Sequence, residues 1–233
     1  MGTIHGVGRR AVLLGLAGLA VSPSASAEDD ASPVAHGVLA NNELAKAFRK
    51  APRELPDVTL VGPQGEFGID KLRGRTILMP LWAEWCAPCM SEIPDFSRLR
   101  QKYANDKFTI IPVLTATAKK FTPALIAGVF NVLHAGTLPP VMEADFGDKL
   151  ARTMARSGRS IEIPCNLLIA PDGTVVGREM GRINAPDASD GPAPEKTKDS
   201  ETITRAINGQ AQSLWGKPEG EAFAAAMAAG FLA

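Results

Sequence analysis

The sequence predicts an α/β fold, with a mixed β-sheet flanked by helices on both faces. Residues 76–81 (TILMPL) and 108–114 (FTIIPVL) are continuous apolar runs, which are typical of buried strands, and apolar residues at helical spacing lie between them. Residues 164–170 (PCNLLIA) and 174–180 are two further strand candidates. The short turn at residues 171–173 joins them, so these two strands are expected to pair antiparallel.

Composition limits the classes of function. The chain has 233 residues, of which 45% are apolar, enough for one domain of ordinary size with extensions. Lys plus Arg and Asp plus Glu both number 25, so the charge balance gives no indication of a nucleic-acid partner. Three cysteines are too few for a disulfide scaffold, and packing must therefore hold the core together.

The first 27 residues have the pattern of an export signal. Arg9 and Arg10 precede an apolar run of eleven residues, 11–21, which is too short to span a bilayer comfortably, and residues 25–27 form an A-x-A cleavage site. The arginine pair resembles a twin-arginine signal, although Gly8 stands where that signal prefers Ser or Thr. We expect export to the bacterial periplasm, where disulfide chemistry is possible. The alternative is an uncleaved signal that anchors the protein.

The segment before the first buried strand is expected to hold two small elements. Residues 28–37 are small and polar and predict a flexible lead. Asn42 is a good N-cap for a short helix that runs to about Lys50. Residues 58–69 alternate around a Gly-Pro and a Gly, as a β-hairpin would.

Four further segments complete the prediction. After Cys89, a helix carries the apolar stripe Met90, Ile93, Phe96 and Leu99, and Pro94 should kink it. Thr122 and Pro123 can open a second helix that runs to residue 136, and residues 145–156 are expected to be helical again. The polar residues 182–201 predict an exposed loop. A terminal helix from Pro218 can dock on the domain through Phe223, Met227 and Phe231.

The pair Cys86 and Cys89, in the stretch WAEWCAPC, has three interpretations. A structural zinc needs four ligands, and the chain has no second cysteine pair and only three histidines. A structural disulfide between residues this close in sequence would close a very small loop and gain little chain entropy. A redox dithiol fits best, because Cys86 ends a strand-to-helix junction, where backbone N–H groups favour the thiolate, which is the nucleophile.

In this interpretation each residue of the motif has a role. Cys86 is the nucleophile, and Cys89 attacks the resulting mixed disulfide and releases the product. Pro88 lies in the first turn of the helix, where its missing N–H costs nothing. Trp85 can shield the pair and shape the rim around it.

The stretch TILMPLWAEWCAPCMSEIPDFSRL resembles the thioredoxin superfamily, and in particular its exported TlpA-like branch. The resemblance runs from about Val58 to Gly181, some half of the chain. It rests on W-x-x-W-C-x-x-C, on Pro94 five residues after the second cysteine, on Ile163-Pro164 before an apolar strand with a Pro-Asp-Gly turn, and on Gly181 at the end of the last strand.

The resemblance implies a thioredoxin-like fold with an N-terminal hairpin and a C-terminal helical extension. The chain then divides into a signal peptide (1–27), a lead with a short helix (28–57), the thioredoxin-like domain (58–185) and a polar loop with the terminal helix (186–233). The resemblance also implies a cis peptide before Pro164, close to the cysteines, with the backbone of Ile163 pairing with an extended substrate segment. The implied substrate-binding residues are Trp85, Ala87, Pro88, Ile163 and Pro164.

Two positions depart from the family pattern. Thioredoxins carry a buried acid six residues before the first cysteine, which helps to move protons during resolution, and here that residue is Pro80. We expect an irregularity in the strand there. Glu84 is the nearest carboxylate in sequence and a candidate proton relay, or simply an exposed residue at the strand end. Cys165 stands where the family has Thr or Ser. It is either a small core residue or a modulator that bonds Cys86 or shares a soft-metal site with it.

The leading functional hypothesis is a periplasmic thiol-disulfide oxidoreductase that reduces disulfides in specific client proteins. The resemblance implies a membrane thiol transporter as the electron donor. We expect no cofactor, no metal and no nucleic-acid partner, and a monomer. The alternatives are a periplasmic oxidant or isomerase and a copper-binding chaperone on the same fold, which Cys165 keeps open.

Overall fold

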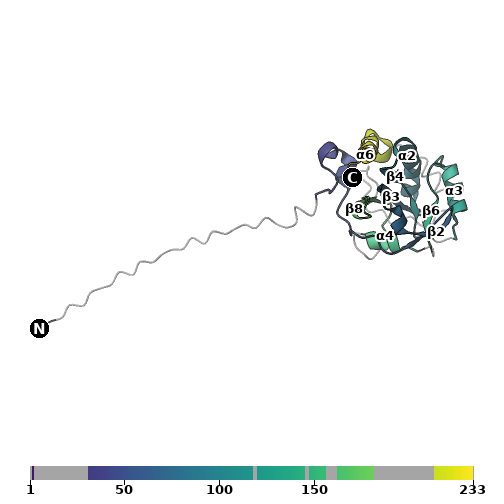
Figure 1. Ribbon diagram of the computed structural model, residues 1–233, viewed down its shortest axis with the longest axis horizontal. Coiled ribbons are helices and arrows are strands. Elements are labelled where there is room, and N and C mark those ends of the chain that lie inside the picture. Colours follow the sequence, from purple (N-terminus) through teal and green to yellow (C-terminus); the bar gives the residue numbers. More distant parts are fainter. Residues whose placement is uncertain are drawn as a thin grey trace.

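The computed structural model describes Gly2 and residues 31–117, 120–144, 147–155, 162–180 and 213–232. The rest of the expected signal peptide, Gly181 and the expected loop 182–201 lie outside the described residues. Figure 1 shows a sheet with helices on both sides. Within the described ranges, every helix is too short or too polar to cross a bilayer.

The elements follow the expected α/β order. The strands are β1 (Thr59–Gly62), β2 (Gly65–Gly68), β3 (Thr76–Trp82), β4 (Phe108–Ile110), β5 (Val113–Leu114), β6 (Val141–Glu143), β7 (Cys165–Ile169) and β8 (Val175–Met180). The α-helices are α1 (Glu43–Ala47), α2 (Ala87–Tyr103), α3 (Pro123–Val132), α4 (Lys149–Met154) and α6 (Pro218–Ala228). Short 3-10 turns are η1 (Gly37–Leu39), η2 (Ile69–Leu72) and η5 (Leu214–Gly216).

The described strands form one mixed sheet in the order β2-β1-β6-β5-β3-β7-β8, with β4 also paired to β3. β3 is central and pairs in parallel with β4 and β5, and antiparallel with β7. The hairpins β1–β2 and β7–β8 are antiparallel, as the sequence predicts. The fold class, a thioredoxin-like mixed sheet flanked by helices, is therefore confirmed.

Pro80 lies in the middle of β3, and the prediction of an irregularity in this strand is wrong, because the interruption lies in the neighbouring strand. β3 runs unbroken through Pro80 and keeps its register with β7. In the parallel register with β4 and β5, the N–H of residue 80 would bond the carbonyl of Ile111, and proline has no N–H. The strand next to β3 is interrupted there, at Ile111 and Pro112, so the sequence run 108–114 forms two strands and not one.

The two faces of the sheet bury separate cores. One core contains Leu78 and Trp82 of β3, both cysteines of the motif, and side chains of α1, α2, α3 and α6. The other contains Ile77 and Leu81 of β3, together with Leu150 and Met154 of α4. In Figure 1, α2 and α6 lie side by side on one side of the sheet, with α4 on the other. The redox motif therefore belongs to the face that α2 and α6 cover.

Both flanking segments are part of the first core. Val34, in the lead that we expected to be flexible, is fully buried there, and Arg49 forms an antiparallel bridge with Arg178 of β8. At the other end of the chain, Trp215 and Phe223 are also fully buried. The prediction of a flexible lead is therefore wrong for Val34, while docking of the terminal helix is confirmed.

The helices are shorter than predicted. Asn42 caps α1 through a bond from the N–H of Ala45, but the helix ends at Ala47 because the next residues pair with β8. Thr122 caps α3 as expected, and this helix ends at Val132. α4 occupies only Lys149–Met154 of the expected 145–156. Between the two predicted helices lies a strand that the sequence analysis did not predict, β6, which joins β1 to β5.

Candidate redox site

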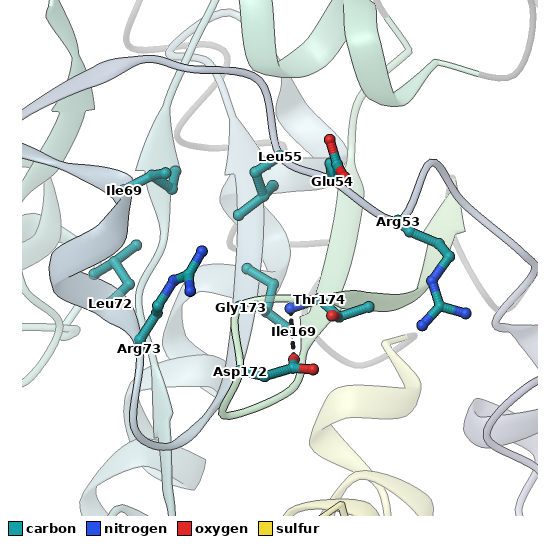
Figure 2. Close-up of a pocket in the computed structure, with 10 residues that line it drawn as sticks. All are labelled: Arg53, Glu54, Leu55, Ile69, Leu72, Arg73, Ile169, Asp172, Gly173 and Thr174. Atoms are coloured by element: carbon teal, nitrogen blue, oxygen red, sulfur yellow. Dashed lines mark hydrogen bonds between the residues drawn. The ribbon is translucent and has the colours of Figure 1, made fainter.

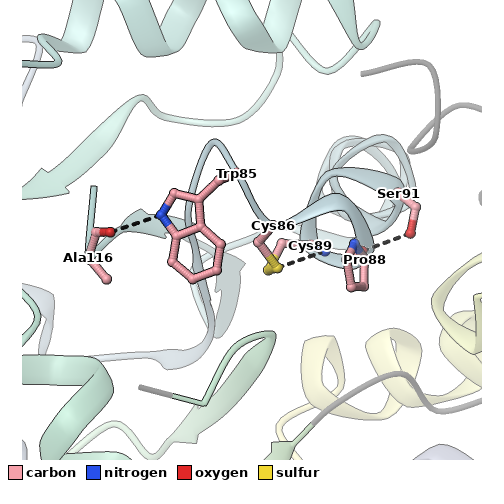
Figure 3. The surroundings of a disulfide bond; sticks show 6 residues. All are labelled: Trp85, Cys86, Pro88, Cys89, Ser91 and Ala116. Carbon is pink, nitrogen blue, oxygen red and sulfur yellow. Dashed lines mark hydrogen bonds between the residues drawn. A yellow bond between two sulfur atoms is a disulfide. The ribbon is translucent and has the colours of Figure 1, made fainter. Parts of the chain in front are cut away.

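The site lies where β3 passes into α2. Cys86 is the N-cap of α2 and forms a disulfide with Cys89. The backbone N–H of Cys89 points at the Cys86 Sγ, with a distance of 3.3 Å (Figure 3). Ala87 and Pro88 fill the first two positions of the helix, where an N–H has no partner within the helix. The geometry places Cys86 where the sequence analysis expects the nucleophile, at a helix N-terminus.

Both sulfur-bearing residues are nearly covered. Cys86 is 3% exposed and Cys89 is 2% exposed, whereas Ala87 and Pro88 are partly exposed. Ser91 Oγ donates to the Pro88 carbonyl at 2.7 Å, and this hydrogen bond stabilises the first turn of α2. Access to the Cys86 sulfur is therefore limited by the residues around it.

Trp85 forms one side of this surface. Its side chain is partly buried against the first core, and its indole Nε1–H donates to the carbonyl of Ala116 at 3.1 Å (Figure 3). Ala116 follows β5 and has a φ of 53°, a backbone conformation that residues other than glycine rarely adopt. The sequence analysis expected Trp85 at the rim, but nothing in the sequence pointed to Ala116.

The loop before β7 lies at the same end of the sheet. The peptide between Ile163 and Pro164 is cis, as the family resemblance implies. The next residue, Cys165, pairs with Leu81, one residue before the end of β3. Ile163 packs against the core that contains both cysteines of the motif. The loop with Ile163 and Pro164 therefore lies at the end of the sheet where β3 passes into the cysteine motif.

Two buried carboxylates lie close to the cysteines in sequence. Glu84 is 9% exposed, so the alternative of an exposed residue at the strand end does not hold. Glu92 is 2% exposed and lies three residues after Cys89, on the same side of α2. The sequence analysis missed Glu92. Its signal was a carboxylate within the apolar stripe of α2, next to Ile93.

Cys165 belongs to the other face of the sheet. It is fully buried, outside the disulfide, and part of the core that contains Leu81 and Met180. Cys86 and Cys89 are part of the core on the opposite face. This placement favours the interpretation of Cys165 as a small core residue. Across the described ranges, no group of three or more His, Cys, Asp or Glu side chains is arranged to hold a metal.

Pro80 occupies the position of the family's buried acid, and a polar residue lies opposite it in the neighbouring strand. Pro80 is opposite Asn166 of β7, and Asn166 is opposite Glu179 of β8. The side chains of all three are on the face that α2 covers, because cross-strand partners point the same way. Asn166 Nδ2 donates to Glu179 Oε2 at 2.7 Å, and both side chains are at most 1% exposed. Nothing in the sequence indicated that the polar side chains of Asn166 and Glu179 are buried.

A separate pocket of about 300 Å³ lies at the other end of the sheet (Figure 2). Its lining includes the apolar Leu55 and Leu72, with Arg53, Arg73 and Asp172 at the rim. Arg73 precedes β3 and Asp172 lies in the β7–β8 turn, so the pocket is remote from the end of β3 that carries the cysteines. It is not part of the redox site.

A disulfide in the first turn of the helix after a central strand, with a cis-proline just before the neighbouring antiparallel strand, is typical of a thioredoxin-like protein. The Redoxin family model matches residues 50–190, more than half of the chain. The chain belongs to the Redoxin family.

Curated relatives and solved structures have related names. "Thioredoxin-like protein YneN" of Bacillus subtilis is 33% identical over 69 residues, 29% of this chain and 40% of YneN, so the match spans less than half of that relative. "Thiol-disulfide oxidoreductase ResA" of Bacillus cereus is 26% identical over 130 residues, 55% of this chain and 69% of ResA. By family and by its cysteine pair, the chain is a thiol-disulfide oxidoreductase.

Many solved structures are similar to this chain, including the following two. The exposed lipoprotein thioredoxin Etrx1 of Streptococcus pneumoniae is 21% identical, with 65% of this chain and 98% of that chain covered and a TM-score of 0.41. A thiol:disulfide interchange protein of Chlorobium tepidum is 22% identical, with coverages of 67% and 97% and a TM-score of 0.42.

Proposed function

We propose that this protein reduces disulfides in client proteins, with Cys86 as the nucleophile and Cys89 as the resolving thiol. The observation that carries the assignment is the geometry at the start of α2. Cys86 caps the helix, and a backbone N–H points at its sulfur. The same environment stabilises a thiolate when the disulfide is reduced, and the thiolate is the reactive form.

The reaction conserves electrons and protons in two exchanges. The Cys86 thiolate attacks one sulfur of the client disulfide, a mixed disulfide forms, and the first client thiolate leaves. Cys89, deprotonated, then attacks the Cys86 sulfur, the Cys86–Cys89 disulfide forms, and the second client thiolate leaves. The two protons of the original dithiol end on the two client thiols. The protein is oxidised by two electrons and the client is reduced by two.

The second exchange needs a group that accepts the proton of Cys89. Pro80 stands where thioredoxins carry an acid in β3, so water or another carboxylate has to accept this proton. Glu92 is a candidate because it is buried on the side of α2 that carries Cys89. Glu84, also buried, is the candidate from the sequence analysis.

The proposed setting is the periplasm. The basic and apolar N-terminal segment with its A-x-A site supports export. A reductase in an oxidising compartment must be re-reduced after each turnover, and a membrane thiol transporter is the proposed donor. The proposed clients are proteins whose disulfides can reach Cys86 as part of an extended segment, beside Ile163 and the cis-proline.

The decisive experiment is the reduction potential of the Cys86–Cys89 pair, measured by equilibration with glutathione buffers. Reference values are about −270 mV for thioredoxin and about −120 mV for a strong periplasmic oxidant. A potential toward the first value supports a reductase. A potential toward the second value overturns the proposal in favour of an oxidant or isomerase, and the absence of reversible exchange would favour the copper-chaperone alternative.

A further inference from the structure

A buried carboxylate on a strand away from the cysteines is connected by a series of hydrogen bonds to Trp85, beside the disulfide. Glu143, the last residue of β6, is 2% exposed. Its Oε1 accepts from the backbone N–H of Leu150 in α4 at 3.1 Å, and its Oε2 accepts from the hydroxyl of Thr115. Burying an ionisable carboxyl is costly unless its oxygens are bonded, and here both oxygens have a donor. Burial raises the pKa of Glu143, and the bonds from Thr115 and Leu150 oppose that shift.

Thr115 is the link between this carboxylate and the loop after β5. Its side chain is buried, with the residue 1% exposed, and its backbone N–H donates to the carbonyl of Trp82 at 2.9 Å. The Thr115 hydroxyl also lies 3.3 Å from the carbonyl of Gly147. Thr115 is therefore bonded at the backbone to the end of β3 and at the side chain to the β6–α4 connection.

Ala116, the next residue, is held in an unfavourable conformation. Its φ of 53° is in the left-handed region, where a residue with a Cβ is strained and remains only if its surroundings fix it. Its N–H donates to the carbonyl of Gly147 at 2.8 Å. Its own carbonyl accepts the indole N–H of Trp85 at 3.1 Å. The strained conformation is what turns that carbonyl toward Trp85, beside the disulfide (Figure 3).

We propose that Glu143 and Thr115 are positioning residues that fix the indole of Trp85 beside the Cys86–Cys89 pair. The carboxylate holds the Thr115 hydroxyl, Thr115 holds the turn at Ala116, and the Ala116 carbonyl holds the indole. A fixed indole leaves the Cys86 sulfur open to an extended protein segment, whereas a released indole is free to move across it. This inference rests on the proposed function, since it concerns how protein disulfides reach Cys86. A small disulfide contacts fewer of the residues around Cys86, so its reaction depends less on how those residues are placed.

The chain offers matched variants for the test. Thr115→Val removes only the hydroxyl, and Thr115→Ser restores it. Glu143→Leu removes both acceptors. Glu143→Gln can still accept from Leu150 and donate to Thr115, whose hydroxyl then turns to the Gly147 carbonyl 3.3 Å away. Asp148→Asn is the control in the same segment, because the Asp148 carboxylate bonds Arg152.

The first readout is the indole N–H of Trp85 in the full chain labelled with ¹⁵N. The sequence has three tryptophans, so three indole signals are expected, and Trp85→Phe identifies the one of interest. Hydrogen exchange at that N–H should be about tenfold faster in Thr115→Val and Glu143→Leu, which corresponds to the loss of about one hydrogen bond. It should return to the wild-type rate in Thr115→Ser and Glu143→Gln. The signal of Trp215, which packs between Phe96 and Phe223, serves as the internal control.

The second readout compares how each variant reacts with a protein disulfide and with a small disulfide. With insulin as the protein disulfide, KM should rise about threefold to tenfold in Thr115→Val, with the rate for 5,5′-dithiobis(2-nitrobenzoic acid) within about twofold of wild type. Trp85→Phe should also raise KM for insulin, and the double variant should raise it no further than either single variant, because both remove one interaction.

The inference is overturned by either of two results in folded variants. One is an unchanged exchange rate at the Trp85 indole, and the other is an equal loss with both substrates. Glu143→Leu carries the greater risk of unfolding, and Thr115→Val alone is then sufficient. A wild-type protein that reduces neither substrate would count against the proposed function, while the indole measurement would still decide whether Glu143 and Thr115 hold Trp85.

Discussion

The two ends of helix α2 use opposite electrostatic arrangements. Its first turn carries the redox pair and has no charged side chain. Its last turns carry Arg98 and Lys102, which meet Glu221 of α6 together with Tyr103. The distance between Lys102 Nζ and the Glu221 carboxylate is 2.7 Å. One helix thus has a neutral reactive end and a strongly charged structural end.

The difference follows from what each end has to do. The charge on Cys86 appears and disappears during each turnover, and a fixed countercharge would favour one redox state. Backbone N–H groups provide a milder and constant stabilisation. The far end has a static task, which is to hold α6 on the domain, so its ion pairs can be permanent. The comparison predicts that changes at one end should leave the other nearly unaffected.

The largest expected effect is at the reactive end. Cys86→Ser should lower turnover by at least about a thousandfold, because no other nucleophile takes its place. Cys89→Ser should still attack a client disulfide once and then remain joined to it, since the resolving thiol is missing. Turnover assays and mass spectrometry of the trapped adduct measure both. A Cys86→Ser protein with turnover within tenfold of wild type would show that the redox assignment is wrong.

The next effect is at the structural end. Trp215 is fully buried between Phe96 of α2, at 5.0 Å between ring centroids, and Phe223 of α6, at 5.6 Å. Trp215→Ala should lower the free energy of unfolding by about 3–5 kcal/mol, the range for a large aromatic residue removed from a core. Denaturant unfolding measures the loss, with Trp215→Phe as the milder control.

The same Trp215→Ala variant tests the separation of the two ends. Its reduction potential should stay within about 30 mV of wild type, which is about 1.4 kcal/mol for a two-electron couple. A larger shift would mean that α6 acts on the cysteines through α2, and the comparison would then fail.

Much of this arrangement could be predicted from the sequence, because it depends on neighbours in the chain. The cysteine spacing, the strand-to-helix junction and the Thr122 cap are local patterns, and the structure has all three. β6 was missed because Val141–Glu143 is only three residues long and follows two prolines, so it shows no periodicity. The burial of Val34 was missed because a single apolar residue in a polar lead has no pattern at all.

Docking of the terminal helix was predicted, but most particular contacts between distant segments could not be. Trp85 and Ala116 are 31 residues apart, and the acceptor is a backbone carbonyl, which is present at every position. The pairing of Asn166 with Glu179 depends on which face of β7 and β8 is covered, and the lead and the terminal helix decide that. The irregularity was predicted in the strand of Pro80 and lies instead in the neighbouring strand, a place that depends on the parallel register.

A third prediction concerns Asp95, midway along α2. Burial raises the pKa of Asp95 to about 6, and nearby Arg98 opposes the shift. Since this pKa is above the unfolded value of 3.8, the folded state favours the neutral acid, and stability should fall as the pH rises from about 4 to 6. Asp95→Asn should remove this loss, which amounts to at most about 3 kcal/mol at pH 7, and should match wild type near pH 4. Chemical denaturation across this pH range measures the difference. A constant difference between the two proteins would contradict the assignment.

The smallest effect is expected at Glu221, where the sign is reversed. Hydrogen bonds from Lys102, Tyr103 and Arg98 lower the pKa of Glu221 to about 2, below its ordinary value of 4.5. The contribution of Glu221 to stability is therefore present above pH 4.5 and lost as the pH falls toward 2. Its size is modest because the Lys102 side chain is 59% exposed, and pairs of this kind are worth about 1 kcal/mol or less.

Glu221→Gln should therefore lower stability at pH 7 and converge with wild type at low pH, which is the opposite of Asp95→Asn. Glu219→Gln removes the same charge from the first turn of α6 without removing the contacts of Glu221 with α2, so it serves as the control. If Glu219→Gln and Glu221→Gln had the same pH profile, general charge on α6 and not the contact with α2 would explain the effect. Salt should weaken the Glu221 contribution and leave the Asp95 effect largely unchanged, since screening acts on exposed pairs and much less on buried groups. Helix α2 would then carry or contact two carboxylates with opposite pH dependence, because burial raises the pKa of Asp95 and the partners of Glu221 lower its pKa.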